Sequence, residues 1–171
     1  VGPRRGHGQR VRAVVGDRPV LEYNIATVEP AGGKHPQFAR SGFIHPVYNP
    51  AGEVVSDSMA PDHMHQHGIM FPWRKTTFEG REVNFWEVQQ GSGRVEHAAV
   101  ESVHSGPVCA QFVVRKRHGD RRAPEGPKAV LAETWRVTVY EAGDAFLFDV
   151  DSTQTCASDS PLQIEKYHYG G

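Results

Sequence analysis

Three histidines stand at alternate positions in the segment DHMHQHG, which begins at Asp62 and ends at Gly68. They are His63, His65 and His67. In an extended strand alternate side chains share a face, so the three imidazoles are expected to point the same way. Imidazoles presented in pairs on a strand can hold zinc at about 2.0–2.1 Å. The segment therefore predicts a divalent metal site on the three histidines, with Asp62 as a ligand or as the partner of a ligand.

Proton transfer is a second interpretation of the same histidines. A neutral imidazole has a pKa near 6.5, so it can donate or accept a proton at physiological pH. A third interpretation is a polar loop whose histidines only bond the backbone, because Pro61 and Gly68 bracket the segment. The residues alone leave these three alternatives open.

A further histidine, His168, stands between Tyr167 and Tyr169 in the terminal segment EKYHYGG. Aromatic rings beside a histidine are common in sugar sites, where the ring faces stack on C–H surfaces. They are equally common as ordinary strand residues. The segment is therefore a candidate sugar site with a plain structural alternative.

Three other side chains could take part in a site. Arg40 can clamp a hydroxyl or a carboxylate, and the alternative is a surface ion pair. In the segment NFWEV, we expect Trp86 to lie in the core and Glu87 to face solvent from a strand. The alternative for Glu87 is a role as a base.

The bulk properties limit the classes of function. The chain has 171 residues, enough for one domain over residues 1–171, and its formal net charge is -1. This charge favours neither nucleic acid nor an anionic membrane as a partner. No apolar run reaches the ~18 residues of a membrane-spanning helix. The chain starts at Val1 without a methionine and stops after a strand-like run, which predicts a fragment of a longer protein or a processed one.

Two local features have their own expectations. The basic stretch VRKRHGDRR, from Val114 to Arg122, contains a Gly-Asp turn signal and is expected to be a solvated hairpin tip. Cys109 and Cys156 belong to no CxxC pair, and Cys109 is expected to be a small core residue. A disulfide between the two cysteines remains open.

The pattern of apolar residues indicates β-structure almost throughout. In AVLAETWRVTVY, apolar Leu131, Trp135, Val137 and Val139 recur with a period of two. The turn EAGD and the alternating segment AFLFDVDST complete a hairpin with one buried and one wet face. The segments RVEHAAVESVHS and PVCAQFVVRKR predict another antiparallel pair. No segment shows a capped helical periodicity, so an all-β antiparallel sandwich is expected.

The segment RSGFIHPVYNPAGEVVSDSMAPDHMHQHGIMFPW, followed by GREVNFWEV, resembles a bacterial family of largely unknown function. Its members are often labelled "methane oxygenase PmoA". The resemblance covers residues 19–171, and its most specific part is the DHxHxHG segment with the Trp-rich strand that follows. This likeness alone implies an exported or periplasmic protein.

A more distant resemblance is to galactose mutarotases (aldose 1-epimerases), which have an Asn-His-Leu-His-Gly-Gly segment. It implies a β-supersandwich fold with a sugar in its concave face, of which this chain would be a piece. In that likeness His65 and His168 would be the proton-handling residues, an isomerase-type role. Arg40, His63, Tyr167 and Trp73 would bind the substrate. His67 stands where that family has a glycine, and the mutarotase general base, a glutamate, would lie beyond residue 171.

We therefore expect a carbohydrate-active or carbohydrate-binding protein with a histidine-based acid/base site, of the epimerase, lyase or hydrolase type. It would need no cofactor, and its partner would be a sugar or a sugar-derived small molecule. One alternative is a metal-binding protein, for example for zinc, that uses His63, His65 and His67. The other alternative is a non-catalytic binding module.

Overall fold

A computed structural model describes residues 2–6 and 8–168 of the chain. The prediction of an all-β fold is confirmed, because the described residues form antiparallel strands and three short 3-10 turns but no α-helix. The elements are β1 (Gly2–Gly6), β2 (Arg10–Val15), β3 (Arg18–Asn24), η1 (Ala31–Gly33), η2 (Pro36–Phe38), β4 (Phe43–Val47), β5 (Ser58–Ala60), β6 (His63–His67), β7 (Thr76–Phe78), β8 (Arg81–Glu82), η3 (Val88–Gln90), β9 (Gly93–Ser105), β10 (Cys109–Asp120), β11 (Lys128–Ala142), β12 (Ala145–Cys156) and β13 (Leu162–Ile164). No helix of the described chain is long and apolar enough to cross a membrane.

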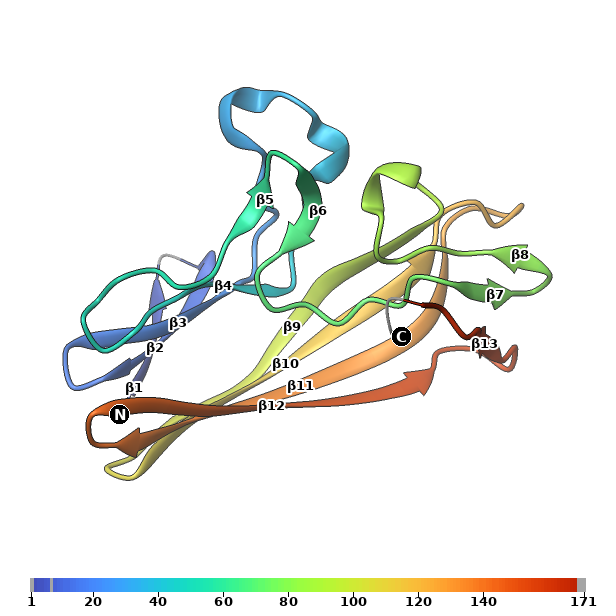
Figure 1. Ribbon diagram of the computed structural model, residues 1–171. Coiled ribbons are helices and arrows are strands. Elements are labelled where there is room, and N and C mark those ends of the chain that lie inside the picture. Colours follow the sequence, from blue (N-terminus) through green and yellow to red (C-terminus); the bar gives the residue numbers. More distant parts are fainter. Residues whose placement is uncertain (1, 7, 169–171) are drawn as a thin grey trace.

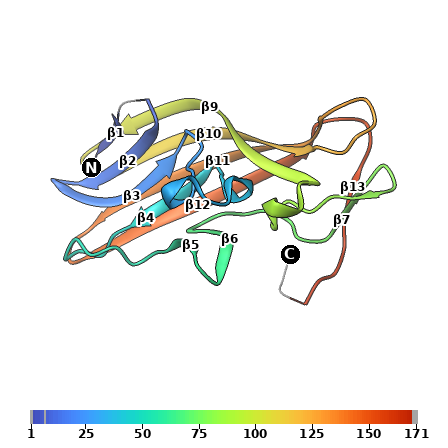
Figure 2. The ribbon, with the colours of Figure 1, turned by 90° about the horizontal axis from the view of Figure 1, so that it is seen from above.

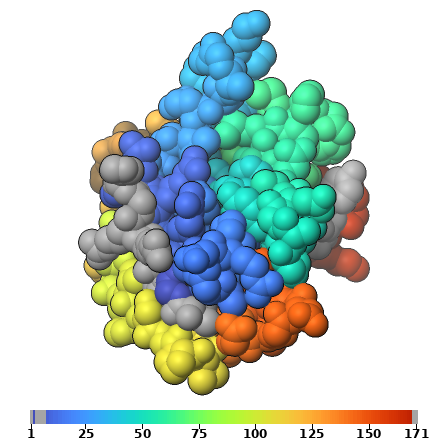
Figure 3. All heavy atoms as spheres, turned by 90° about the vertical axis from the view of Figure 1, so that its left-hand side faces the viewer, coloured from blue at the N-terminus to red at the C-terminus, as the bar shows by residue number. Residues whose placement is uncertain are grey.

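Two four-stranded sheets make up most of the molecule, with the orders β1-β2-β3-β4 and β12-β11-β10-β9. The N-terminal sheet packs on one face of the longer sheet, near one end, as Figures 1 and 2 show. Figure 3 shows this end of the molecule, with β2 and β3 (blue) above the β9–β10 turn (yellow) and the β11–β12 turn (orange). This arrangement is a β-sandwich.

The core between the two sheets follows from the alternation of side chains along the strands. Tyr23 and Ile44 of the N-terminal sheet meet Phe112, Trp135 and Val137 of the long sheet, and all five are buried. The predicted period-two pattern of β11 is thus confirmed. The hairpin predicted after it is confirmed as well, because Ala142 pairs with Ala145 around the Gly143 turn, where φ is 65°.

Two smaller sheets lie beside this sandwich. β5 and β6 form a hairpin, and β13, β7 and β8 form a three-stranded sheet toward the other end of the long strands (Figure 1). A second core, which includes Phe78, Phe85 and Val95, fixes the three-stranded sheet against the long one. The hollow between β6 and this end of the molecule is where the candidate site forms.

The expectation of a hairpin tip at the basic stretch is wrong for residues 114–120, and of this stretch only Arg121 and Arg122 lie exposed in the connection to β11. Residues up to Asp120 continue β10, which pairs with both β9 and β11. Lys116, His118 and Asp120 point inward and are buried, whereas Arg115 and Arg117 point outward and are exposed. The Gly-Asp signal marks a bulge next to His118 rather than a turn. The strand therefore divides its basic residues between the two faces of the sheet.

The two cysteines do not pair. Cys109 lies opposite Tyr140 of β11, and Cys156 lies opposite Leu131 of the same strand. Those two β11 positions are nine residues apart, which is about 30 Å of strand at about 3.3 Å per residue. A disulfide requires Cα atoms within about 7 Å. Cys109 is half-buried rather than fully buried, and Cys156 is exposed.

Candidate functional site

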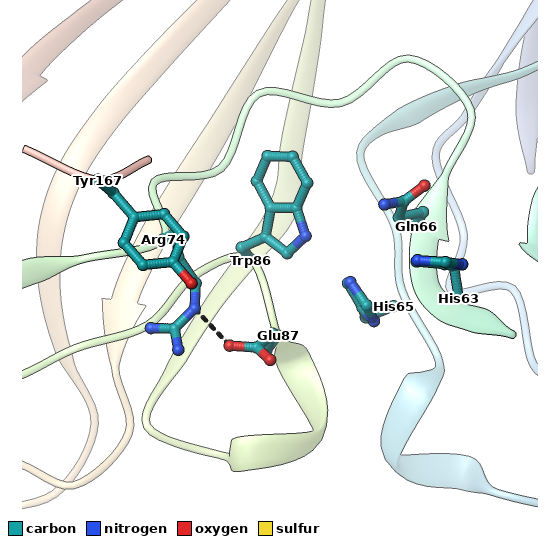
Figure 4. Close-up of a pocket in the computed structure, with 7 residues that line it drawn as sticks. All are labelled: His63, His65, Gln66, Arg74, Trp86, Glu87 and Tyr167. Carbon is teal, nitrogen blue, oxygen red and sulfur yellow. Dashed lines mark ion pairs between the residues drawn. The ribbon is translucent and has the colours of Figure 1, made fainter. Parts of the chain in front are cut away.

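A cavity of about 390 Å³ opens between the β5–β6 hairpin and the segments that surround β7, η3 and β13. Figure 4 shows its lining from four separate parts of the chain. The lining side chains are His63, His65, Gln66, Arg74, Trp86, Glu87 and Tyr167. Two imidazoles, a carboxylate, a guanidinium and two aromatic rings therefore meet in one hollow, although residues from 63 to 167 contribute to it.

Gly68 fixes the end of β6 against the N-terminal sheet. Its φ is 56°, a left-handed conformation that favours glycine. A Cβ at this position would lie 2.2 Å from the carbonyl oxygen of Ile44. The next residue, Ile69, pairs with Ile44 through hydrogen bonds of 3.0 Å in both directions. The close approach of the two backbones therefore requires glycine and holds the histidine strand in place.

The expectation that the three histidines share one face is only partly confirmed. His63 and His65 line the cavity, with ring centroids 5.9 Å apart, but His67 does not. Ser58 of β5 pairs with His67 and Ala60 pairs with His63, so two steps of β5 face four steps of β6. The extra residues interrupt the alternation of β6. As a result, Gln66 lies in the cavity and His67 points into the interior.

His67 is fully buried against Phe43, with ring centroids 5.2 Å apart, and its Nδ1 lies 3.5 Å from the Ser58 hydroxyl. Burial, followed by the charge of Arg40, lowers the pKa of His67 to about 3. Within the described residues, no three His, Cys, Asp or Glu side chains form a group that could hold a metal ion. The three-histidine ligand set of the metal alternative is therefore not assembled, and Asp62 instead pairs with His63 at 3.0 Å.

Glu87 is held on the cavity wall by three donors, all of which contact its Oε2. Arg74 Nε lies at 2.5 Å, and the side-chain amides of Asn84 and Gln90 each donate at 2.9 Å. The Asn84 Oδ1 accepts from the backbone N–H groups of Trp86 and Glu87, both at 3.0 Å, which fixes this turn. The three donors fix the position of the carboxylate, and within the described residues Oε1 has no donor.

The Arg74 guanidinium lies 5.1 Å from the centre of the Tyr167 ring, a cation–π contact. Arg74 therefore links the carboxylate of Glu87 to an aromatic wall of the cavity. In Figure 4, Tyr167 and Arg74 lie on one side of the cavity and the histidines of β6 lie on the other. Trp86 and Glu87 lie between these two sides.

His65 lies on the cavity wall in surroundings that perturb its pKa. Partial burial lowers its pKa below 6.5, and the charges of His63 and Arg40 add to this effect, while the carboxylate of Glu87 opposes it. The lowered pKa keeps His65 neutral at pH 7. A neutral imidazole can accept a proton from a hydroxyl group that enters the cavity.

Three predicted site residues lie away from the cavity lining. Arg40 is fully buried, and its Nη2 donates to the carbonyl of Phe85 at 3.1 Å. Trp73 packs on the second core and donates from Nε1 to Gln154 at 2.7 Å. His168 is exposed and its ring lies 4.4 Å from that of Tyr167. Tyr169 lies outside the described residues. Of the predicted residues, the structure thus brings together His63, His65 and Tyr167.

Gln66, Arg74, Trp86 and Glu87 also line the cavity but were not predicted to do so as a group. The expectations that Trp86 lies in the core and that Glu87 lies in a strand are wrong, because the chain turns at Asn84 into η3. An Asn three residues before an acidic residue is a turn signal that could have been noticed. No local pattern identifies Arg74.

A second polar cluster lies in the interior, centred on Glu133 of β11. Its carboxylate accepts from His118 Nε2 at 2.6 Å, Lys116 Nζ at 3.1 Å, Trp135 Nε1 at 2.5 Å and Ser152 Oγ at 2.7 Å. Burial alone would raise the pKa of Glu133, but His118 and Lys116 outweigh this effect and lower it. The carboxylate therefore stays charged inside the sandwich, where several donors offset the cost of its burial, while Nδ1 of His118 has no partner among the described residues.

Lys116 connects this cluster to the core. Its ammonium lies 3.5 Å from the centre of the Trp135 ring, and burial lowers its pKa to about 8 although Glu133 opposes the change. In the sheet register, Lys116 lies opposite His97 on one side and Glu133 on the other. His97 in turn contacts the hydroxyl of Tyr23 at 3.0 Å. A polar row thus crosses the inner face of the long sheet without reaching the cavity.

Comparison with known proteins identifies a family. A family model described as "Family of unknown function (DUF6807)" matches residues 10–171. No curated protein and no solved structure matches the chain significantly. Because the match covers nearly the whole sequence, the chain belongs to this family of unknown function, DUF6807.

Proposed function

We propose that the protein binds a sugar in the cavity of His65 and Glu87 and transfers a proton at one of its hydroxyl groups. One observation supports this most directly. A neutral imidazole and a fixed carboxylate line the same cavity, with aromatic rings beside them. Sugars offer many hydroxyl groups and flat C–H faces. Charged and amide side chains can form hydrogen bonds with the hydroxyl groups, and aromatic rings can stack on the C–H faces.

The proposed chemistry is a proton transfer at the anomeric hydroxyl group. Neutral His65 would accept the hydroxyl proton, and the resulting imidazolium would return a proton to the ring oxygen as the ring C–O bond breaks. The hemiacetal then opens to an aldehyde with no net gain or loss of protons. A positioned acid/base group of this kind contributes a rate factor of about 10²–10⁴.

The neighbours of His65 would position the sugar. The free Oε1 of Glu87 can accept from a hydroxyl group, and Gln66 and His63 can donate to one. Trp86 and Tyr167 offer ring faces for stacking. The sequence resemblance to mutarotases points in the same direction, although the residues that pair with His65 in this cavity differ from those expected in the sequence.

The proposal can be tested by calorimetric titration with monosaccharides and uronic acids, combined with polarimetry of their anomerisation. We expect millimolar binding of at least one sugar and faster anomerisation, both weakened by His65→Ala. His104→Ala, at an exposed position of β9, is the matched control. If no sugar binds at millimolar concentration, the proposal fails. Binding without any anomerisation, unchanged in His65→Ala, would instead identify a non-catalytic binding module.

A further inference from the structure

The outer face of β9 and β10 has a hollow of about 190 Å³ that the cavity around His65 does not include. Four cationic side chains line it, and one carboxylate, Glu96, accompanies them. The cations are Arg94, Arg117, Arg121 and Lys128. They come from β9, from β10 and its end, and from the start of β11, so the fold gathers charges that are 34 residues apart in the sequence.

Two of these arginines have no acceptor in the protein. The side chains of Arg117 and Arg121 make no hydrogen bond and no ion pair with any residue that the structure describes. Both residues are exposed. Their guanidinium donors are therefore available to a ligand.

Arg94 adds a third guanidinium group beside the hollow. Its Nη2 donates to the carbonyl of Ala39 at 2.9 Å. Its Nε lies 3.1 Å from Glu96 Oε1, but this contact lacks hydrogen-bond geometry, and the buried Nε has no acceptor among the described residues. A ligand in the hollow cannot reach this buried nitrogen, so Arg94 contributes to the hollow through its positive charge.

The remaining charges do not cancel this excess. Lys128 is paired with Glu79, which lies outside the hollow. Glu96 is more than half exposed and neutralises one arginine. Two ion pairs, Lys128 with Glu79 and Arg94 with Glu96, carry no net charge. The two remaining arginines therefore leave two positive charges at the hollow.

We propose that this hollow, formed by Arg94, Arg117 and Arg121, binds an oxyanion of the phosphate or sulfate type. Guanidinium groups present forks of N–H donors that match the oxygens of such an anion. The volume is below the roughly 300–1,000 Å³ of sites for drug-sized ligands, which suits a small group. The anion is either free in solution or the terminal group of a small phosphorylated or sulfated molecule.

The backbone at this position also suits close approach. Gly119 lines the hollow at the bulge of β10 and presents no side chain there. The proposed anion site lies on the face of β10 opposite to Lys116 and His118, so it is separate from both the Glu133 cluster and the proposed sugar cavity. Its success or failure therefore does not depend on the proposed function.

The test is calorimetric titration of the whole protein with inorganic phosphate, sulfate and glucose 6-phosphate, with chloride added to keep the ionic strength constant. We expect saturable binding at one site, weakened by about tenfold or more in the double variant Arg117→Gln/Arg121→Gln, because charge-assisted hydrogen bonds are lost. The control Arg136→Gln removes an exposed arginine of β11 that does not line the hollow, and it should bind as the unchanged protein does.

The outcomes separate the two sources of the anion. Tighter binding of glucose 6-phosphate than of phosphate would show that the anion is the end group of a small molecule, and equal binding would show that the free anion suffices. Absence of saturable binding at about 10 mM, or an equal loss in Arg136→Gln, would overturn the proposal. Urea unfolding of the double variant should match that of the unchanged protein, since both side chains are exposed and unpaired.

Discussion

Among single residues, His65 and Glu87 define the proposed chemistry because the surroundings lower the pKa of His65 and fix the position of Glu87. His65 is kept neutral by partial burial, and Glu87 is held in place by Arg74 and two amides. The two groups thus differ in their roles: the imidazole can take a proton, and the carboxylate can orient a hydroxyl group. Neither role could be assigned from the types of residue alone.

The first prediction concerns the pH dependence of catalysis. Because the pKa of His65 is lowered from 6.5, its neutral form persists to lower pH than that of a free histidine. The value of kcat/KM for anomerisation should therefore decline on the acid side with a midpoint below pH 6.5. A pH–rate profile by polarimetry measures this. A decline centred above pH 6.5 would contradict the role of His65 as the base.

The second prediction concerns the buried carboxylate of Glu133. In Glu133→Gln, Lys116 would remain buried without its counter-charge, since both side chains are essentially inaccessible to solvent. The free energy of unfolding should fall by about 3–5 kcal/mol. The control Glu101→Gln removes the exposed partner of Arg115 and should change it by less than about 1 kcal/mol. Urea unfolding of both variants measures the difference, and equal effects would argue against the importance of the buried pair.

The third prediction concerns His67 and acid stability. The unfolded chain binds a proton at this residue near pH 6.5, whereas the folded chain binds it only near pH 3. Between these values the unfolded state holds more protons, so the stability falls as the pH falls, by up to about 1.4 kcal/mol per pH unit. His67→Gln should reduce the slope of unfolding free energy against pH in this range. A slope that matches that of the exposed control His104→Gln would refute the argument.

At the level of the strand and the turn, β6 shows how a local irregularity selects the residues of a site. The alternation of histidines in the sequence predicts a regular strand, but the extra residues of β6 against β5 turn His67 inward and Gln66 toward the cavity. The sequence contains no sign of this mismatch, because it depends on how β5 pairs with β6. The site therefore contains only part of the histidine cluster.

The fourth prediction tests the anchor of this strand. Gly68→Ala would place a methyl group 2.2 Å from the Ile44 carbonyl at a residue with φ of 56°. The variant should lose stability, by about 3 kcal/mol or more, and sugar binding with it. Gly80→Ala is the control, because its φ is 75° but nothing lies within 4 Å of the added Cβ. It should cost only about 1–2 kcal/mol. Similar losses by thermal unfolding would show that the contact with Ile44 does not matter.

For the whole molecule, the long hairpins and the all-β class follow from the period-two pattern of segments such as residues 128–142, because that pattern reflects burial on one face of a strand. The polar row was also visible in principle. Lys116 and Glu133 occupy positions in phase with the apolar residues Val114 and Trp135, which marks them as inward-facing. An inward-facing charge is a signal that a pairing partner lies on the neighbouring strand.

The candidate cavity could not be predicted to the same extent. Its residues come from the β5–β6 hairpin, the turn at Asn84 and the segment after β13, and their proximity depends on how small sheets pack on the long one. Arg40 illustrates the difference, since the resemblance to mutarotases assigned it to substrate binding, yet packing buries it away from the cavity lining. Spacing along the chain identifies candidate residues, but tertiary contacts decide which of them meet.

The central claim is that a sugar occupies the cavity of His65, and an NMR titration tests it most directly. The signals to follow are the His65 ring C–H and the indole N–H of Trp86, with the indole N–H of Trp73 as an internal reference because it is bound to Gln154 outside the cavity. On titration with monosaccharides and uronic acids, we expect saturable shifts of His65 and Trp86 and little change at Trp73. If both cavity signals stay unchanged for every sugar at millimolar concentration, the claim is contradicted.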